Sequence, residues 1–156
     1  MSNMLSAVRF AGIVRDTPLI SIDLIVSHQG KYLFGRRSFE PAKGYWFVPG
    51  GRIRKGENFD KAFDRLTNDE LGVHLSLSDA AFHGVYEHHY DTNFSENGDF
   101  GTHYVVLAYR LEMPTFPSEL PDEQHTAYRW LSEDQIKDDE FIHDYTKDYF
   151  NRNQDG

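Results

Sequence analysis

The segment from residue 45 to residue 72 constrains the fold more than any other part of the sequence. A run of aromatic and β-branched residues, Tyr45–Val48, leads into Pro49-Gly50-Gly51, where glycine permits a tight turn and a close approach of the backbone to a ligand. From about Asn58 to Leu71, apolar residues recur with the spacing of one helix face, and Gly72 is a stop signal. These signals predict a strand, a glycine turn and a helix, in that order.

One charged residue interrupts the apolar face of this helix. At about 100° per residue, Glu70 points the same way as Phe59, Phe63 and Leu66, toward the expected sheet. A carboxylate in a partly dry site is costly unless it pairs with a cation or binds a metal. A glutamate near a helix C-terminus can also turn to solvent or pair with an arginine, and Glu70 taken alone favours this structural interpretation over a metal ligand.

The rest of the chain alternates between predicted strands and helices. Polar and apolar residues alternate in two segments around His28-Gln29-Gly30, which predicts a β-hairpin. The hairpin strands are Leu19–Val26 and Lys31–Arg37, and further strands are expected at Ala81–Tyr90, His103–Glu112 and Tyr128–Leu131. Further helices are expected at Met4–Val14, at Ser132–Asp138 with a Ser132/Gln135 capping box, and at Asp139–Phe150. This order predicts an α+β or α/β class with a mixed sheet between helices.

Length, charge and composition narrow the possible functions. A chain of 156 residues is the size of one domain, which we divide into an N-terminal segment 1–16, a central part, and a C-terminal helix and tail at 139–156. With no cysteine and no apolar run that could span a bilayer or act as a signal, we expect a cytoplasmic protein without membrane contact. The net charge of -9 argues against nucleic acid as a partner, although clustered arginines, Arg36, Arg37, Arg52, Arg54 and Arg65, leave room for a small phosphorylated ligand.

The glycine turn and the helix together resemble the sequence box of the Nudix superfamily. The matching positions are Gly51, Glu57, Arg65, Asp69, Glu70, Gly72 and Val73. The resemblance implies the Nudix fold, an α+β fold whose mixed β-sheet is sandwiched between α-helices. It also implies a hydrolase in which carboxylates on the helix face a Mg²⁺ ion, which prefers oxygen ligands and substrate phosphates.

Three box positions depart from the superfamily pattern. Leu66 and Asp69 stand where glutamates are usual, and Thr67 replaces an aliphatic residue. The altered stretch beginning Arg65-Leu-Thr is similar to that of the GDP-mannose mannosyl hydrolases. The likeness to that family extends from Thr17 to Leu131 and includes Gly44-Tyr-Trp-Phe-Val-Pro-Gly-Gly-Arg52 and Pro121-Asp-Glu-Gln-His125.

This resemblance implies a metal centre and a substrate. One Mg²⁺ per subunit, replaceable by Mn²⁺, would be held by the Gly50 carbonyl, Glu70 and Gln124, and the diphosphate of a GDP-hexose would complete its shell. The products would be GDP and a free hexose, released when water attacks the anomeric carbon with inversion. His125 would be the general base, a role that suits an imidazole near neutral pH. The family also implies a homodimer.

The remaining site residues each have a second interpretation. Asp23 falls on a family active-site position, but it could instead be a hydrogen-bonded strand acid. Arg37, Arg52 and Arg65 would contact the diphosphate or support the site, because a planar guanidinium suits phosphate, although Arg65 could equally pair with Asp69 at i+4. The other two candidates are Tyr104, as a phosphate contact or a core tyrosine, and His88, as a site residue or a packed strand histidine.

Two rival functions remain open at this point. A Nudix pyrophosphatase would cleave a nucleoside diphosphate derivative at phosphorus, and the apolar Leu66 argues against it. A Nudix module that binds a nucleotide without hydrolysing it is the other rival, and the presence of Glu70, Gln124 and His125 argues against that one. The preferred hexose cannot be deduced from the sequence pattern.

Overall fold

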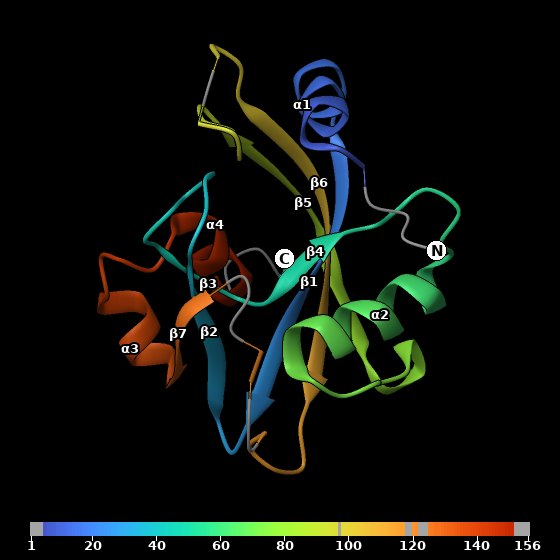
Figure 1. Ribbon diagram of the computed structural model, residues 1–156. Coiled ribbons are helices and arrows are strands. Elements are labelled where there is room, and N and C mark those ends of the chain that lie inside the picture. The colour runs from blue at the N-terminus through green and yellow to red at the C-terminus, as the bar shows by residue number, and fades with distance from the viewer. Residues whose placement is uncertain (1–4, 97, 118–119, 122–124, 152–156) are drawn as a thin grey trace.

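A computed structural model describes residues 5–96, 98–117, 120–121 and 125–151, with the backbone alone for residues 125 and 126. Within these ranges seven strands form one sheet: β1 (Leu19–His28), β2 (Lys31–Arg37), β3 (Trp46–Phe47), β4 (Gly50–Arg52), β5 (Ala81–Tyr90), β6 (Thr102–Glu112) and β7 (His125–Leu131). The helices there are α1 (Ala7–Asp16), α2 (Phe59–Leu71), α3 (Glu133–Asp138) and α4 (Asp144–Lys147), with 3-10 turns η1 (Leu77–Asp79) and η2 (Asp148–Phe150). Figure 1 shows α2 on one side of the sheet and α3 and α4 on the other.

Strand β1 is the centre of a mixed sheet. It pairs in parallel with β6 from Leu19↔Tyr104 to Ser27↔Glu112, and β6 pairs antiparallel with the edge strand β5. Next to the turn, β1 pairs with β2 at Ser27↔Tyr32 and His28↔Lys31. Farther from the turn, the same edge of β1 pairs with β4 at Ser21–Asp23. The hairpin therefore opens as it leaves its turn, and the glycine segment is inserted beside β1.

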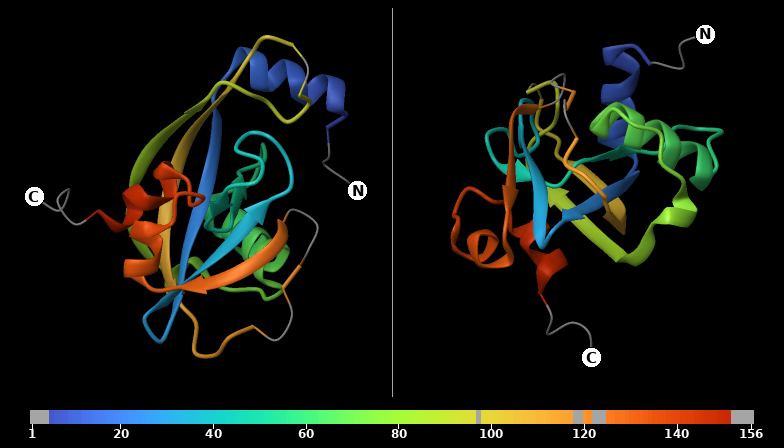
Figure 2. Two further views of the ribbon diagram at one scale, coloured as in Figure 1. Left: turned by 90° about the vertical axis from the view of Figure 1, so that its left-hand side faces the viewer. Right: turned by 90° about the horizontal axis from the view of Figure 1, so that it is seen from below.

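Two hydrophobic cores lie on the two faces of this sheet. Toward α2, the core contains Ala62, Phe63 and Leu66 of the helix packed against alternate residues of β1, Ile22, Leu24 and Val26. On the other face, the core of Ile25, Phe34, Val48, Ala108, Leu131, Ile136, Ile142 and Tyr149 joins the sheet to the C-terminal elements. The views in Figure 2 show the same division, which confirms the predicted sandwich. No helix in the described part of the chain is long and apolar enough to cross a membrane.

The helix α2 has the limits that its sequence predicts. The Asn58 side chain caps it by accepting a hydrogen bond from the Lys61 amide at 2.8 Å, and Gly72 ends it in the left-handed region at φ 76°. Phe63 is fully buried, whereas Phe59 in the first turn is 53% exposed, so the predicted apolar stripe is wrong at that residue. Glu70 is only 3% exposed and does lie on the buried face.

The C-terminal segment differs from the single helix predicted over residues 139–150. Residues before Asp144 run beside β3, where the Trp46 amide donates to the Phe141 carbonyl at 2.8 Å and the His143 amide donates to the Trp46 carbonyl at 3.2 Å. These backbone groups are engaged by a strand and are therefore not available for helical hydrogen bonds. The helix begins only at Asp144, and the apolar spacing that predicted it extends too far toward the N-terminus.

We expect Phe63→Ala to lower the free energy of unfolding by about 3–5 kcal/mol, because it leaves a cavity between α2 and the sheet. The matched control, Phe59→Ala, removes the same ring from an exposed position on the same helix and should stay within about 0.5 kcal/mol of the parent protein. Urea unfolding followed by circular dichroism measures both. Equal losses in the two variants would contradict the packing of α2 described here.

Candidate functional site

A cavity of about 610 Å³ lies where the hairpin opens and β4 joins β1. Its walls come from α1, the strands β1, β2, β4, β5 and β6, and the last turns of α2. Its charged and polar lining includes Asp23, Arg37, Arg52, Arg65, Asp69, Glu70, His88, Tyr90 and Tyr104. Seven of the sequence-predicted site residues, Asp23, Arg37, Arg52, Arg65, Glu70, His88 and Tyr104, therefore line one cavity together with Gly50.

At the bottom of this cavity, Gly50 lies between two carboxyl groups. Its amide donates to Glu70 Oε1 at 3.1 Å, and the strand register places it opposite Asp23. A Cβ atom at position 50 would collide with Asp23 Oδ1 and with the Ile22 carbonyl oxygen. Only glycine therefore lets the backbone, the Asp23 carboxyl and the Glu70 carboxyl converge at this point.

The second oxygen of Asp23 accepts a hydrogen bond from the Tyr149 hydroxyl, which comes from the C-terminal 3-10 turn η2. The pKa of the Asp23 carboxyl is raised to about 7, chiefly by burial and to a smaller extent by the charge of Glu70, while the Tyr149 hydrogen bond and Arg37 partly oppose the shift. Asp23 is thus a carboxyl group that changes its charge near neutral pH. The hydrogen bond from Tyr149 is what the alternative, a hydrogen-bonded strand acid, predicts for Asp23. That alternative does not account for the position of Asp23 in the cavity lining.

His88 is packed against the same C-terminal segment. It is 4% exposed, its ring stacks on Tyr145 with centroids 4.3 Å apart, and its Nε2 lies 3.4 Å from the Tyr149 hydroxyl oxygen. Burial lowers the pKa of His88 to about 4, so the imidazole is neutral at pH 7. His88 therefore both lines the cavity and packs as a strand histidine.

Two arginines line the cavity from different strands. Arg37, at the end of β2, donates from Nε to the Pro41 carbonyl at 2.8 Å, and its guanidinium lies 5.5 Å from the centre of the Phe47 ring. The Arg52 guanidinium, on β4, lies 4.7 Å from the centre of the Phe10 ring of α1, and burial together with Arg54 and Arg65 lowers its pKa. These aromatic contacts orient both cations.

Tyr104, at the start of β6, completes this part of the wall, and burial raises the pKa of its hydroxyl. The phenol therefore stays protonated near neutral pH. As such it can donate a hydrogen bond to an anion.

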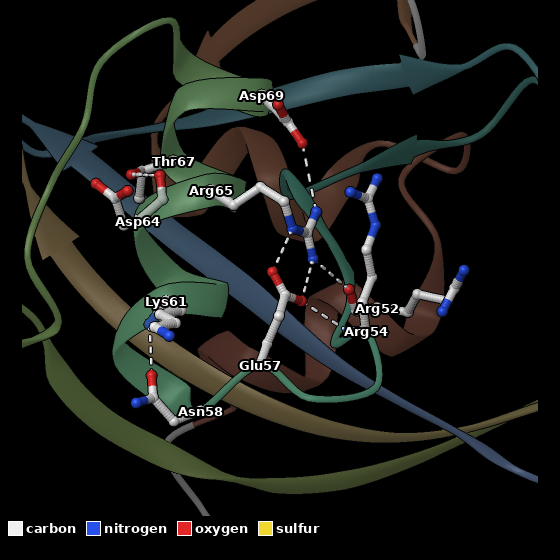
Figure 3. A network of polar contacts seen from close by, with 9 residues as sticks. All are labelled: Arg52, Arg54, Glu57, Asn58, Lys61, Asp64, Arg65, Thr67 and Asp69. Carbon is white, nitrogen blue, oxygen red and sulfur yellow. Dashed lines mark hydrogen bonds and ion pairs between the residues drawn. The ribbon is translucent and has the colours of Figure 1, made fainter. Parts of the chain in front are cut away.

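Arg65 has a different set of partners. Its guanidinium donates to both oxygens of Glu57, at 2.7 and 2.8 Å, to the Arg52 carbonyl at 2.9 Å and to Asp69 at 3.3 Å (Figure 3). The hydrogen bonds from Arg65 lower the pKa of the Glu57 carboxyl. Arg65 thus ties α2 to the segment after the glycine turn, and the i+4 pairing with Asp69 is present.

The three departures from the Nudix box have structural roles. Leu66 is 3% exposed and fills the space that a side chain at Gly51 would need. Thr67 is fully buried; its hydroxyl donates to the Asp64 carbonyl and accepts from the Leu75 amide, both at 3.0 Å. Asp69 lies at the cavity rim, where it pairs with Arg65.

The structure does not describe the side chains of two predicted site residues. Gln124 lies outside the described residues, and only the backbone of His125 is described. His125 is the first residue of β7 and pairs with Arg37 of β2. The backbone of His125 therefore lies in the sheet beside an arginine that lines the cavity.

The sequence analysis missed Tyr149 as a site residue. It assigned Tyr149 to the apolar stripe of a helix, and its ring does pack in the core, but its hydroxyl reaches Asp23. These two residues are 126 positions apart, and no local pattern links them.

The donor set at the bottom of the cavity fits a hard divalent cation. Asp23 and Glu70 provide carboxyl oxygens, and the glycine turn between them provides backbone carbonyl groups. Mg²⁺ binds oxygen ligands of this kind and usually retains positions for water and substrate phosphates. The arginines on the walls add positive charge where a phosphate group would lie.

Comparison with known proteins identifies the family to which the chain belongs. The family model described as NUDIX domain matches residues 18–150. The low-salt glycan biosynthesis protein Agl8 of Haloferax volcanii is 38% identical over 117 residues, which are 75% of this chain and 72% of that protein. The RNA pyrophosphohydrolase of Orientia tsutsugamushi is 29% identical over 70 residues, or 44% of its length.

Solved structures show the same fold. A MutT NUDIX hydrolase from Burkholderia pseudomallei has a TM-score of 0.67 at 23% identity, over 86% of this chain and 96% of that one. The MutT protein from Methanosarcina mazei has a TM-score of 0.69 at 20% identity, over 90% and 96% of the two chains. Nudix hydrolases use divalent metal ions. From its fold, its box and the family match, this chain belongs to the Nudix family of hydrolases.

Proposed function

We propose that this Nudix hydrolase cleaves GDP-mannose, and GDP-glucose as a second substrate, into GDP and free hexose. The observation that carries the proposal is the burial of Leu66, an apolar side chain at a box position where the superfamily has a metal-binding glutamate. The cavity then retains a donor set around Glu70 that suits a single cation. One cation that neutralises a diphosphate leaving group is enough for cleavage at carbon, whereas attack on phosphorus in this superfamily relies on a larger carboxylate cluster.

The resemblance to Agl8 supports a sugar-containing substrate. That protein is named for a role in glycan biosynthesis, and its similarity covers about three quarters of this chain. Leu66 and Asp69 of the altered box, together with Phe47, Val48 and residues 50–52, line the cavity. Part of the likeness to GDP-mannose mannosyl hydrolases, which runs from Thr17 to Leu131, therefore falls where a substrate would bind.

In the proposed site, the Gly50 carbonyl, Glu70 and Gln124 hold Mg²⁺. When bound, the ion supplies positive charge that stabilises the diphosphate as a leaving group. Arg37 and Arg52, from different strands, bind the phosphate oxygens and orient the nucleotide, while the protonated Tyr104 hydroxyl donates a hydrogen bond to it. Arg65 supports the site indirectly, because its partners fix the segment that carries Arg52.

His125 is the proposed general base. Its backbone lies beside Arg37, so the imidazole would approach the substrate from the strand that follows the Gln124 position. It takes a proton from water as the water oxygen bonds to the anomeric carbon, while the bond from that carbon to the diphosphate oxygen breaks. The configuration of the sugar is inverted, because water enters opposite the leaving group.

Product analysis in ¹⁸O-water tests the reaction itself. With GDP-mannose and Mg²⁺ we expect GDP and free mannose, with the label in the sugar and none in phosphate, because the bond broken is carbon–oxygen. Label in the phosphate of GMP or of mannose phosphate would instead show a pyrophosphatase. Tight binding of GDP-mannose without turnover would show a non-catalytic binding module.

The variant His125→Gln tests the base. With Mg²⁺ saturating at every pH tested, we expect kcat to fall by about 10²–10⁴-fold while the affinity for GDP changes little, and the residual activity should lose its dependence on pH near neutrality. His74→Gln is the matched control, since His74 is an exposed histidine paired with Asp64 outside the cavity. A wild-type pH profile in His125→Gln would remove His125 as the base.

The raised pKa of Asp23 predicts a pH dependence of Mg²⁺ binding. Below pH 7 the Asp23 carboxyl is protonated in the metal-free protein, and a nearby cation must displace this proton. The apparent Mg²⁺ affinity should therefore rise with pH, by up to about ten-fold per unit below pH 7, and level off above it. Calorimetric titrations with Mg²⁺ at several pH values measure this. Asp23→Asn should bind Mg²⁺ with a flatter profile, and an unchanged slope would assign the proton to another group.

A further inference from the structure

A second group of potential metal ligands lies outside the cavity, on the edge of the sheet. Glu87 and His89 of β5 and His103 of β6 each offer one donor atom, and these three atoms lie within 4.8 Å of one another. We propose that these residues bind a first-row divalent transition ion, with Zn²⁺ as the best match. This site is separate from the proposed Mg²⁺ centre and does not depend on the proposed substrate.

The strand register brings the two histidines together. His89 is directly opposite His103 in the antiparallel pair β5·β6. The backbone amide of His89 donates to the Tyr145 hydroxyl at 2.9 Å, and that hydroxyl donates to the His89 carbonyl at 2.8 Å. Because these backbone groups point away from β6, the two histidines form a non-hydrogen-bonded pair, in which side chains lie closest. Their rings stack with centroids 4.1 Å apart.

Glu87 adds a carboxylate on the same face of β5. It is two residues from His89, so its side chain points the same way, while His88 and Tyr90 between and after them point into the cavity. Glu87 and His89 are both exposed. The proposed transition-metal site therefore lies at the solvent-exposed edge strand β5, on the opposite face of that strand from His88 and Tyr90, which line the cavity.

A polar atom within the cluster also lacks a partner. His103 Nε2 is buried and makes no hydrogen bond to the described part of the chain. A buried polar atom without a partner is costly, and most such atoms in proteins are paired with protein or bound groups. Coordination of an ion through this nitrogen would supply the missing partner.

The chemistry of the donors selects the ion. Two imidazoles and one carboxylate form a known zinc ligand set that leaves one coordination position open for water or another ligand. Imidazole nitrogen favours zinc, copper and nickel over Mg²⁺, which prefers oxygen ligands in octahedral geometry. Zinc–nitrogen bonds of about 2.0–2.1 Å require the donor atoms to move closer together, which the exposed side chains of Glu87 and His89 can do by rotation.

Binding at this position would join the edge strand to its neighbour. The Tyr145 hydroxyl already fixes the backbone of His89, so part of the site is held in place before an ion arrives. An ion that binds the folded chain and not the unfolded one raises the unfolding temperature. Zinc should therefore stabilise the β5·β6 pair as well as bind to it.

The test measures Zn²⁺ bound to the full chain in the presence of excess Mg²⁺, which occupies the oxygen site. Equilibrium dialysis should give one Zn²⁺ per chain for the parent protein and an affinity weaker by more than about ten-fold for His89→Asn. His74→Asn, the matched exposed histidine, should bind as the parent does. Equal zinc binding by the parent and His89→Asn, or no binding by the parent, would overturn the proposal.

Two further readouts separate a built site from adventitious binding. Co²⁺ in place of Zn²⁺ should give the intense visible absorption of four-coordinate cobalt in the parent protein, weakened in both Glu87→Gln and His103→Asn. Zinc should raise the unfolding temperature of the parent and of His74→Asn, but not that of His89→Asn. If His103→Asn unfolds without zinc, the exposed variants at positions 87 and 89 still decide the outcome. Cobalt spectra that are the same in the parent and in Glu87→Gln and His89→Asn would show an adventitious ion only.

Discussion

The site depends on the absence of a side chain at position 50. Gly50 lies against Asp23 on β1 and donates its amide to Glu70 on α2, so one backbone position joins the central strand, the glycine turn and the helix. Any Cβ there would push β4 away from β1 and separate the two carboxyl groups. The buried charge of Glu70, which is at odds with the apolar face of α2, makes sense because of this turn. The same face of α2 covers the sheet and places the Glu70 carboxylate in the cavity.

The three arginines of the cavity differ in their partners: Arg65 forms ion pairs within the protein, whereas Arg37 and Arg52 contact aromatic rings. Arg65 is held by Glu57, Asp69 and a backbone carbonyl, so its charge is neutralised within the α2 network. Arg37 and Arg52 instead rest on aromatic rings with their guanidinium groups at the cavity wall. A chain with a net charge of -9 thus concentrates positive charge where a diphosphate would enter. The three arginines look alike in sequence, and only their partners distinguish them.

Local signals predicted α2, its glycine stop and most strands, because helix ends and periodic burial are encoded by neighbouring residues. They were wrong where tertiary contacts decide. Phe59 fits the helix stripe but extends beyond the covered part of the sheet, and residues 139–143 pair with β3 instead of forming a helix. The candidate site was predicted largely from family resemblance, and the structure brings most of those residues to one cavity. The pairing of His89 with His103 was missed, because it depends on the register between two strands.

The contact between Asp23 and Tyr149 has a consequence for the order in which the molecule is made. β1 is synthesised early, yet it pairs with β6, and its aspartate receives its phenol partner from a residue 126 positions later. Contacts of such long sequence separation form slowly, because the loop must close before they contribute energy. A chain that has been synthesised only as far as α2 therefore lacks β6, which pairs with β1, and Tyr149, whose hydroxyl contacts Asp23. The cavity around Asp23 can therefore reach its final form only after β6 and Tyr149 have joined the fold.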